Sequence, residues 1–301
     1  MTPPPLAQVA ADLAAEDSLP PGQSLTRRAI ARFFQNRAAV AGIVVIAVIA
    51  LLSVIVPALN PGEVQRVNWN SLLLPPSSEY PFGTDVNGRD LFVRVFYAGR
   101  ISLAIGILAT SVAVVIGIIY GATAGFVGGR VDAVMMRFCD VIYALPTLFI
   151  IIILVTTLGS KNILIIFCCI GAVEWLTIAR IVRGQTLSVK KKEYVEAARA
   201  IGLSTPAILR RYIIPNVTSP VIVYVTLLIP INILIESYLS FLGLGVQEPL
   251  ASWGQLISQG SNEMENAPWL LIFPSLLLTA TLFAFNFIGD GLRDVLDPKD
   301  R

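Results

Sequence analysis

Residues 190–216 read K-K-K-E-Y-V-E-A-A-R-A-I-G-L-S-T-P-A-I-L-R-R-Y-I-I-P-N, a charged stretch in an otherwise apolar chain. Eight lysines, arginines and glutamates fall between Lys190 and Arg211. Each charge costs roughly 2.5–3.5 kcal/mol at the centre of a bilayer. The stretch is therefore expected to lie in water, between membrane-spanning segments.

The local signals within this stretch predict a helix, an elbow and a second helix. Residues 193–200 favour a helix, and Gly202 offers a backbone that can reverse direction. Thr205 followed by Pro206 is typical of an N-cap with proline at the first helical position. Pro215 marks the next boundary, because proline lacks an N–H and disfavours helix in the residue before it.

The spacing of Glu196-Ala197-Ala198, Gly202 and Pro215 resembles the E-A-A…G…P loop of permease subunits in binding-protein-dependent ABC importers. The resemblance implies that residues 190–216 are a coupling loop, with a short coupling helix that sits in a groove of a separate ATPase subunit. An ordinary solvated loop is the alternative, but three elements at this spacing favour coupling. The residues assigned to ATPase coupling are Glu196, Ala197, Ala198, Gly202, Leu203, Pro206, Arg210 and Pro215.

The composition is that of a multi-pass membrane protein. Hydrophobic residues make up 55% of the 301 residues and charged residues 14%, and the net charge of +2 is too small to indicate nucleic-acid binding. The sequence has no histidine, which excludes H-E-x-x-H zinc sites and histidine-dependent triads. It also has no Walker A motif. We therefore expect no catalytic residue, metal site or cofactor on this chain, with ATP and Mg on partner ATPase subunits. Cys139, Cys168 and Cys169 are interpreted as small packing residues.

Charge-free runs predict six membrane spans in an all-α protein, since about 20 residues cross a bilayer. The runs are 38–59, 101–121, 141–158, 162–179, 217–239 and 269–288, with kinks expected at Pro146, Pro230 and Pro274. If the N-terminus is inside, 17 of the 22 lysines and arginines lie inside and 5 outside. The positive-inside rule then places both termini and the charged loop in the cytoplasm.

These spans divide the chain into five parts. Residues 1–37 form a cytoplasmic tail that ends in a basic amphipathic helix suited to anionic lipids. Residues 38–59 are the first transmembrane helix, and residues 60–99 are a periplasmic loop with an amphipathic helix at 89–98. Residues 100–290 form a permease core of five transmembrane helices, and residues 291–301 a cytoplasmic tail.

The outer segments strengthen the resemblance. F-G-T-D-V-N-G-R-D at 82–90 is similar to a signature of C-type permeases in oligopeptide and dipeptide importers, as are the segments 236–254 and 285–301. A calcium loop is excluded at 85–96, because its glycine comes at the fourth position instead of the sixth. Tyr212 departs from the family pattern, which often has histidine there.

Span two carries a glycine at every fourth residue, namely Gly117, Gly121, Gly125 and Gly129. Such a column of small residues lets a neighbouring helix approach closely. We therefore predict a helix-packing face.

Four polar residues in or near the spans are candidates for the translocation path: Asp140, Glu174, Asn232 and Glu236. Intramembrane carboxylates usually face a cavity or a partner. The alternative is a structural role near the interfaces, for example an ion pair between Asp140 and Arg137.

Taken together, the resemblance implies a permease subunit in the bacterial inner membrane with the type I ABC importer fold. It implies a B-type permease as the other half, two ABC ATPase subunits, a periplasmic peptide-binding protein and alternating access for oligopeptides. Alternatives left open are transport of dipeptides, nickel or another small solute by the same kind of importer. An ion-coupled carrier or channel, or a non-transporting scaffold or receptor, would leave the Glu196 loop without a use.

Overall fold

The computed structural model describes residues 25–159 and 162–296, and the described part is almost entirely helical. It contains no strand, only an isolated bridge between Thr84 and Asp90. The predicted all-α fold class is therefore confirmed. The predicted tail at 1–24 lies outside the described residues, as do Lys161 and the last residues, 297–301.

The helices of the described part follow one another with short connections, except after α3 and α10. They are α2 (Leu25–Gln35), α3 (Arg37–Leu59), α4 (Leu91–Val127), α5 (Gly129–Tyr143), α6 (Thr147–Leu158), α7 (Ile163–Val189), α8 (Glu193–Ala200), α9 (Thr205–Ile208), the π-helix η1 (Leu209–Ile213), α10 (Ile214–Phe241), α11 (Trp253–Asn262) and α12 (Trp269–Leu296).

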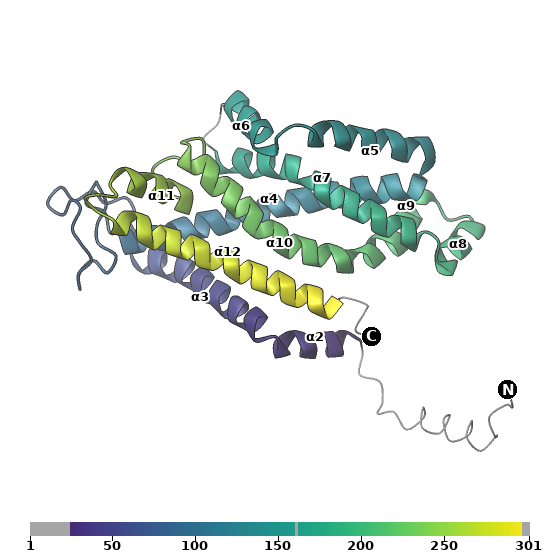
Figure 1. Ribbon diagram of the computed structural model, residues 1–301, viewed down its shortest axis with the longest axis horizontal. Coiled ribbons are helices and arrows are strands. Elements are labelled where there is room, and N and C mark those ends of the chain that lie inside the picture. The colour runs from purple at the N-terminus through teal and green to yellow at the C-terminus, as the bar shows by residue number, and fades with distance from the viewer. Residues whose placement is uncertain (1–24, 160–161, 297–301) are drawn as a thin grey trace, which may run out of the picture.

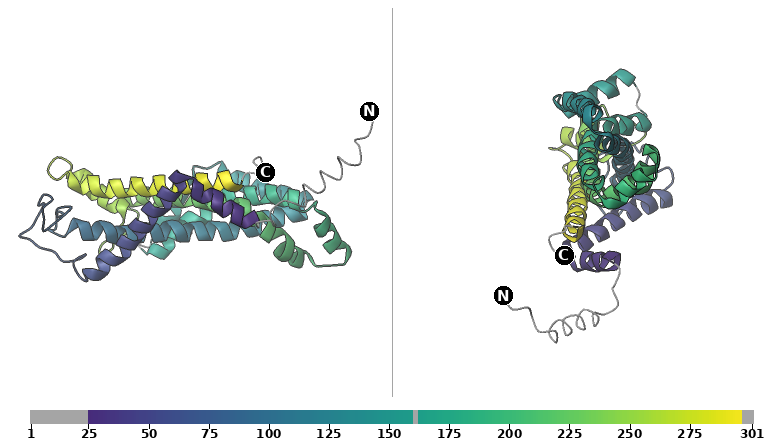
Figure 2. Two further views of the ribbon diagram at one scale, coloured as in Figure 1. Left: turned by 90° about the horizontal axis from the view of Figure 1, so that it is seen from below. Right: turned by 90° about the vertical axis from the view of Figure 1, so that its right-hand side faces the viewer.

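The long helices run side by side along the long axis of the molecule (Figure 1). The charged loop with α8 and α9 lies at one end, while α11 and the segment between α3 and α4 lie at the other (Figures 1 and 2). Within the described residues, α3, α4, α7, most of α10 and α12 are long and apolar enough to cross a membrane. The bent pair α5–α6 makes a sixth span if it is counted as one.

The third predicted span, 141–158, is wrong in its course. α5 ends at Tyr143 and α6 begins at Thr147, and the two axes are bent by 84°. Pro146 has no N–H to donate and disfavours helix in Leu145, so it breaks the helix and does not merely kink it. Pro230 and Pro274 lie inside the continuous helices α10 and α12.

The predicted amphipathic helix at 89–98 is not a separate element. It is the first part of α4, which begins at Leu91 after Asp90 caps it by accepting from the N–H groups of Phe92 and Val93. α4 has 37 residues, or about 55 Å of helix. α7 likewise continues beyond the predicted 162–179, to Val189.

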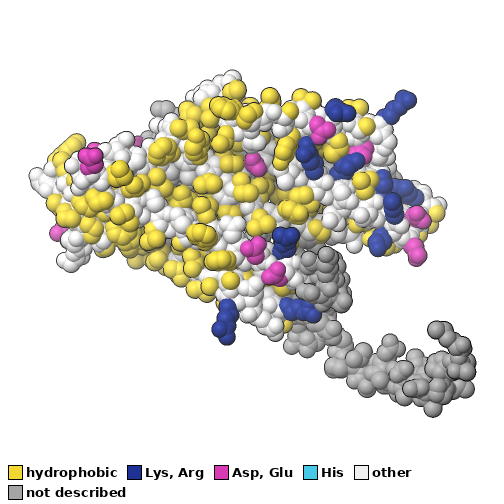
Figure 3. Space-filling model, in the orientation of Figure 1, with side chains coloured by type: hydrophobic (Ala, Val, Ile, Leu, Met, Phe, Trp, Pro, Cys, Tyr) yellow, Lys and Arg dark blue, Asp and Glu magenta, His cyan; other side chains and the backbone are white. Residues whose placement is uncertain are grey.

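α4 is the central helix: α7 has the most extensive contact with it, and α3, α10 and α11 also pack against it. Trp253 of α11 is fully buried there, and its indole Nε1 donates to the Val95 carbonyl at 3.0 Å. Lysine and arginine side chains gather toward the end that carries α8 (Figure 3). The predicted orientation depends on this segregation.

Candidate functional site

The charged loop folds as a short helix, a reversal and a second helical run. α8 ends at Ala200, and Gly202 has φ +83°, which an L side chain rarely adopts. The N–H of Leu203 donates to the carbonyl of Ala198 at 3.1 Å, and that of Gly202 to Arg199 at 3.0 Å. This is a Schellman turn, and it needs glycine at the reversal.

The second half of the loop differs from its prediction in two details. The N-cap of α9 is Ser204 and not Thr205, so Thr205 and Pro206 form the first turn. Pro215 lies in the first turn of α10, and the run from α9 through η1 into α10 stays helical. Because this run is continuous, Pro215 does not begin a new helix, and its missing N–H falls directly after the π-turn of η1. Arg210 is exposed, and Leu203 is half-buried.

α8 buries one face and leaves the other open. Val195 and Ala198 pack into the core beside α7 and α9, while Tyr194, Ala197 and Ile201 are exposed. The spacing of these three exposed residues, i, i+3 and i+7, places them on one side of the helix. Ile201 is 76% exposed, which leaves an apolar surface of the loop uncovered within the described chain.

Two contacts connect the loop to the end of α4. Lys190 Nζ donates to the Gly125 carbonyl at 2.7 Å, and the Arg199 guanidinium lies 4.5 Å from the centre of the Phe126 ring. A cavity of about 590 Å³ lies between the loop and this end of α4. It is lined by Phe126, Val127, Lys190, Lys191, Glu196, Arg199, Leu203, Thr205 and Ile208. A displacement of α8 would therefore act directly on α4.

Glu196 is exposed and forms no ion pair with the described part of the chain. Its carboxylate therefore remains available to a partner. Clusters of three or more histidine, cysteine, aspartate or glutamate side chains that could hold a metal ion do not occur among the described residues.

Three of the four predicted glycines bring α4 against α7. A Cβ on Gly117 would lie 2.6 Å from Ile178 Cβ, and a Cβ on Gly125 would lie 2.8 Å from Thr186 Cβ. At Gly121 the clash would be with the Ala179 backbone oxygen. Only a residue without Cβ permits this helix separation.

Gly129 is the exception, and its predicted packing role is wrong. It starts α5 with φ +57°, and a Cβ there would meet nothing within 4 Å. The column ends because Gly128, with φ +73°, turns the chain away from the face of α4.

The candidate path residues fall into two groups. Asp140 pairs with Arg180 at 2.9 Å and not with the predicted Arg137, and Arg180 also lies 4.2 Å from the Tyr143 ring. Glu174 on α7 is half-buried. A second ion pair, Asp132 with Arg183 at 2.5 Å and 2.7 Å, was not predicted.

Asn232 and Glu236 are both fully buried between α10 and α4. Asn232 Nδ2 donates to Thr110 Oγ1 at 2.8 Å. Glu236 accepts from Ser102 Oγ at 3.1 Å and from Ser240 Oγ at 2.6 Å. In this conformation the structure places both inside the packing of the chain, and a role in the path stays a prediction.

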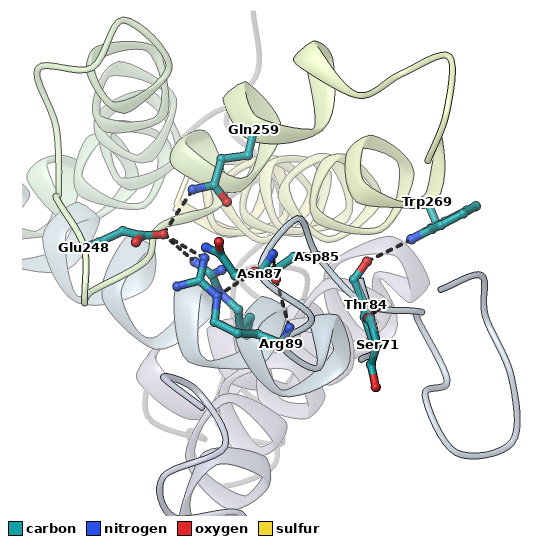
Figure 4. A network of polar contacts seen from close by, with 9 residues as sticks. Ser71, Thr84, Asp85, Asn87, Arg89, Glu248, Gln259 and Trp269 are labelled. Carbon is teal, nitrogen blue, oxygen red and sulfur yellow. Dashed lines mark hydrogen bonds and ion pairs between the residues drawn. The ribbon is translucent and has the colours of Figure 1, made fainter. Parts of the chain in front are cut away.

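The opposite end holds an ionic network that sequence reasoning missed (Figure 4). Asp85 Oδ2 accepts from Arg89 Nε at 2.7 Å and also from Arg94, and all three side chains are buried. Arg89 Nη2 reaches Glu248 at 2.8 Å, and Gln259 donates to the same carboxylate oxygen at 3.3 Å. The hydrogen bond from Arg89 lowers the pKa of the Glu248 carboxyl below its usual range.

The network ties the segment before α4 to the segment after α10 and to α11. Its local frame is the turn at 85–88, where the N–H groups of Asn87 and Arg89 donate to Asp85 Oδ1 at 2.8 Å and 2.9 Å. A further tie runs from Trp269 Nε1 to the Thr84 carbonyl at 3.3 Å (Figure 4). The signal in the sequence was the presence of two aspartates and two arginines in the ten residues 85–94, where an apolar helix begins.

Comparison with known proteins gives two family matches. Residues 91–301 match the model of the binding-protein-dependent transport system inner membrane component. Residues 24–76 match that of the N-terminal TM domain of oligopeptide transport permease C.

Individual relatives align over nearly the whole chain. The oligopeptide transport system permease protein OppC of Haemophilus influenzae is 52% identical, over 93% of this chain and 90% of the relative. The protein of the same name in Escherichia coli K12 is 54% identical, over 93% of each chain. The dipeptide transport system permease protein DppC of Bacillus subtilis is 42% identical, over 93% of this chain and 88% of the relative.

Proposed function

The chain belongs to the family of binding-protein-dependent transport system inner membrane components, and we propose that it carries oligopeptides as a permease subunit of an ATP-driven ABC importer. It is a multi-pass protein of the inner membrane. The observation that carries this conclusion is the 52–54% identity to oligopeptide permeases over 93% of the chain.

The importer needs further subunits for ATP hydrolysis, since the sequence holds no Walker A motif. This chain pairs with a B-type permease to enclose the path. Two ATPase subunits bind ATP and Mg and contact the charged loop from the cytoplasm. A periplasmic peptide-binding protein delivers the peptide at the end of the chain opposite to the charged loop. The chain itself has no enzymatic role and no nucleic-acid partner.

Coupling to the ATPases runs through α8. Tyr194 and Ala197 on its exposed face, with Ile201 at its C-cap, offer an apolar surface to a groove. Glu196 offers a carboxylate to a basic residue in that groove. Gly202 fixes the angle between α8 and α9. Leu203, Pro206, Arg210 and Pro215 belong to the same surface and its support.

Alternating access follows from the contacts behind the loop. When ATP closes the ATPase dimer, α8 moves with its groove, and Lys190 and Arg199 transmit the displacement to α4. The close packing of α4 on α7 makes the two helices move as one unit. Asp140, Glu174, Asn232 and Glu236 are the candidates that such a movement would expose to the path.

The coupling role is tested by two substitutions on α8. Glu196→Lys removes a charge-assisted contact worth about 1.5–3 kcal/mol, so ATPase retention and peptide-stimulated ATP hydrolysis should fall about tenfold or more. Ile201→Asp should act in the same direction by placing a charge in the apolar contact. Glu265→Lys, the same charge change at an exposed position of the opposite end, is the control and should retain the ATPases. Normal retention and hydrolysis in both α8 variants would exclude the loop as the transmission.

Dipeptide transport is the second candidate, because a 42% identical relative is a dipeptide transport system permease protein. Uptake of a labelled tetrapeptide and a labelled dipeptide, in cells with and without this chain, separates the two. Loss of tetrapeptide uptake alone supports the oligopeptide assignment. Loss of dipeptide uptake alone would replace it.

A further inference from the structure

A polar pocket lies where two apolar spans end. Its volume is about 460 Å³, and it is lined by Arg32, Gln35, Asn36, Gly291, Asp294 and Val295. Asn36 caps α3, and Val295 is the last residue of the apolar span in α12. Both walls of the pocket thus leave the apolar part of the chain at the same depth. This depth is where the headgroups of a bilayer lie.

α2 forms one wall of the pocket and is built as an interfacial helix. Phe33 is buried against α12, since a Cβ on Gly291 would lie 3.3 Å from its ring. Ile30 and Phe34, one turn apart, are 53% and 61% exposed. α2 therefore has one face on the protein and an apolar face that remains open beside the end of α12 (Figure 1). A helix of this kind lies in the membrane surface.

The pocket carries both signs of charge. Arg32 and Asp294 are exposed on its walls, and Asn36 Nδ2 donates to Asp294 Oδ2 at 3.4 Å. A guanidinium has five N–H donors, so Arg32 can hold a phosphate in addition to its contact within the chain. A carboxylate at the same depth favours a cation that can donate hydrogen bonds.

We infer that this pocket binds the headgroup of a phospholipid with a primary ammonium, of the phosphatidylethanolamine type. The lipid phosphate contacts Arg32, the ammonium contacts Asp294, and the acyl chains lie along the open faces of α2 and α3. An anionic headgroup without an ammonium would place its charge against Asp294. The site is independent of peptide transport, because the permease function stands whether or not this lipid is bound.

The test uses the complete, delipidated transporter and native mass spectrometry with three lipids of identical acyl chains. Wild-type complex should bind phosphatidylethanolamine about tenfold more tightly than phosphatidylcholine, whose quaternary ammonium has no N–H to donate, and more tightly than phosphatidylglycerol. Asp294→Asn should abolish the preference for phosphatidylethanolamine, and Arg32→Gln should weaken all three. Asp290→Asn and Arg37→Gln, at exposed positions outside the pocket lining, should behave as wild type.

A series of lipids that differ only in the methylation of the ammonium tests the same site without any substitution in the protein. With wild-type complex, affinity should fall stepwise from phosphatidylethanolamine through its N,N-dimethyl form to phosphatidylcholine. Equal affinity along this series, or a preference for phosphatidylglycerol that Asp294→Asn leaves unchanged, would overturn the inference and leave only a basic surface.

Discussion

Gly121 shows how closely a single residue sets the separation of two helices. A Cβ at this position would clash with the backbone oxygen of Ala179, which cannot move without moving α7. Gly121→Ala should therefore lower the free energy of unfolding of the transporter by about 1–3 kcal/mol. Thermal unfolding of the purified complex measures the change.

Gly184 provides the matched control, because it lies in α7 itself and a Cβ there would meet nothing within 4 Å. Gly184→Ala should leave the midpoint unchanged or raise it, since alanine favours helix by up to about 1 kcal/mol. Equal destabilisation by both substitutions would mean that the close approach of α4 to α7 contributes nothing.

Glu248 makes the ionic network around Asp85 sensitive to acid. Arg89 lowers the pKa of this carboxyl, so its contribution to stability is fully present above the unfolded value of about 4.3 and is lost as pH falls through the folded value. Glu248→Gln should lower the free energy of unfolding at pH 7 by about 1 kcal/mol or less, because the Glu248 side chain is 44% exposed. The deficit should shrink below about pH 4. A deficit that grows on acidification would contradict the ion pair.

Individual residues were predictable where the signal is local. The reversal at Gly202 follows from one glycine after a helix-forming run, and the structure has φ +83° there. The packing role predicted for Gly129 was wrong because its spacing continues the glycine column of α4, whereas the chain already turns at Gly128. The predicted ion-pair partner of Asp140 was wrong because the actual partner, Arg180, lies 40 residues away in the sequence. The two residues become adjacent only when α5 packs on α7.

Among the elements, α5 joins α7 through two ion pairs, in addition to the apolar packing around Cys139. Of its 15 residues only Asp132 and Cys139 are buried, while Asp132 and Asp140 pair with Arg183 and Arg180 of α7. Asp132→Arg should destabilise the complex by about 1–3 kcal/mol, between the exposed and the buried limits for an ion pair. The double change Asp132→Arg with Arg183→Asp should recover most of the loss.

Peptide-stimulated ATP hydrolysis and the unfolding midpoint report on this charge exchange. Reversal of the charge at Arg130, an exposed residue on α5, serves as the control and should have little effect on either measurement. A double variant as impaired as the single one would show that the pairing itself does not matter.

The existence of the long helices was predictable from charge-free runs, but their ends were not. The predicted span starts at 101, after Arg100, but α4 begins ten residues earlier, at Leu91, where Asp90 caps it. Its first turns can include the charged side chain of Arg94 because this side chain pairs with the buried Asp85. The break at 144–146 required a choice between a kink and a termination at Pro146. That choice depends on packing, since α6 packs on α7, whereas α5 contacts α4 as well as α7.

At the scale of the whole molecule, the orientation in the membrane depends on the 17 to 5 distribution of lysine and arginine. In a background without Cys139, Cys168 and Cys169, a cysteine at exposed Ser78 should react with an impermeant thiol reagent from outside. A cysteine at exposed Ser204, next to α8, should react only after permeabilisation. The opposite labelling pattern would invert the topology and place the coupling loop away from ATP.

The central claim is that this chain forms part of a path through which ATP drives peptides inward. The most direct measurement is peptide uptake by proteoliposomes that contain the permease pair and ATPases, with the binding protein outside and ATP sealed inside. Accumulation of labelled tetrapeptide should require ATP on the side of α8 and should be lost when this chain is omitted. Accumulation without this chain, or without ATP on that side, would contradict the account.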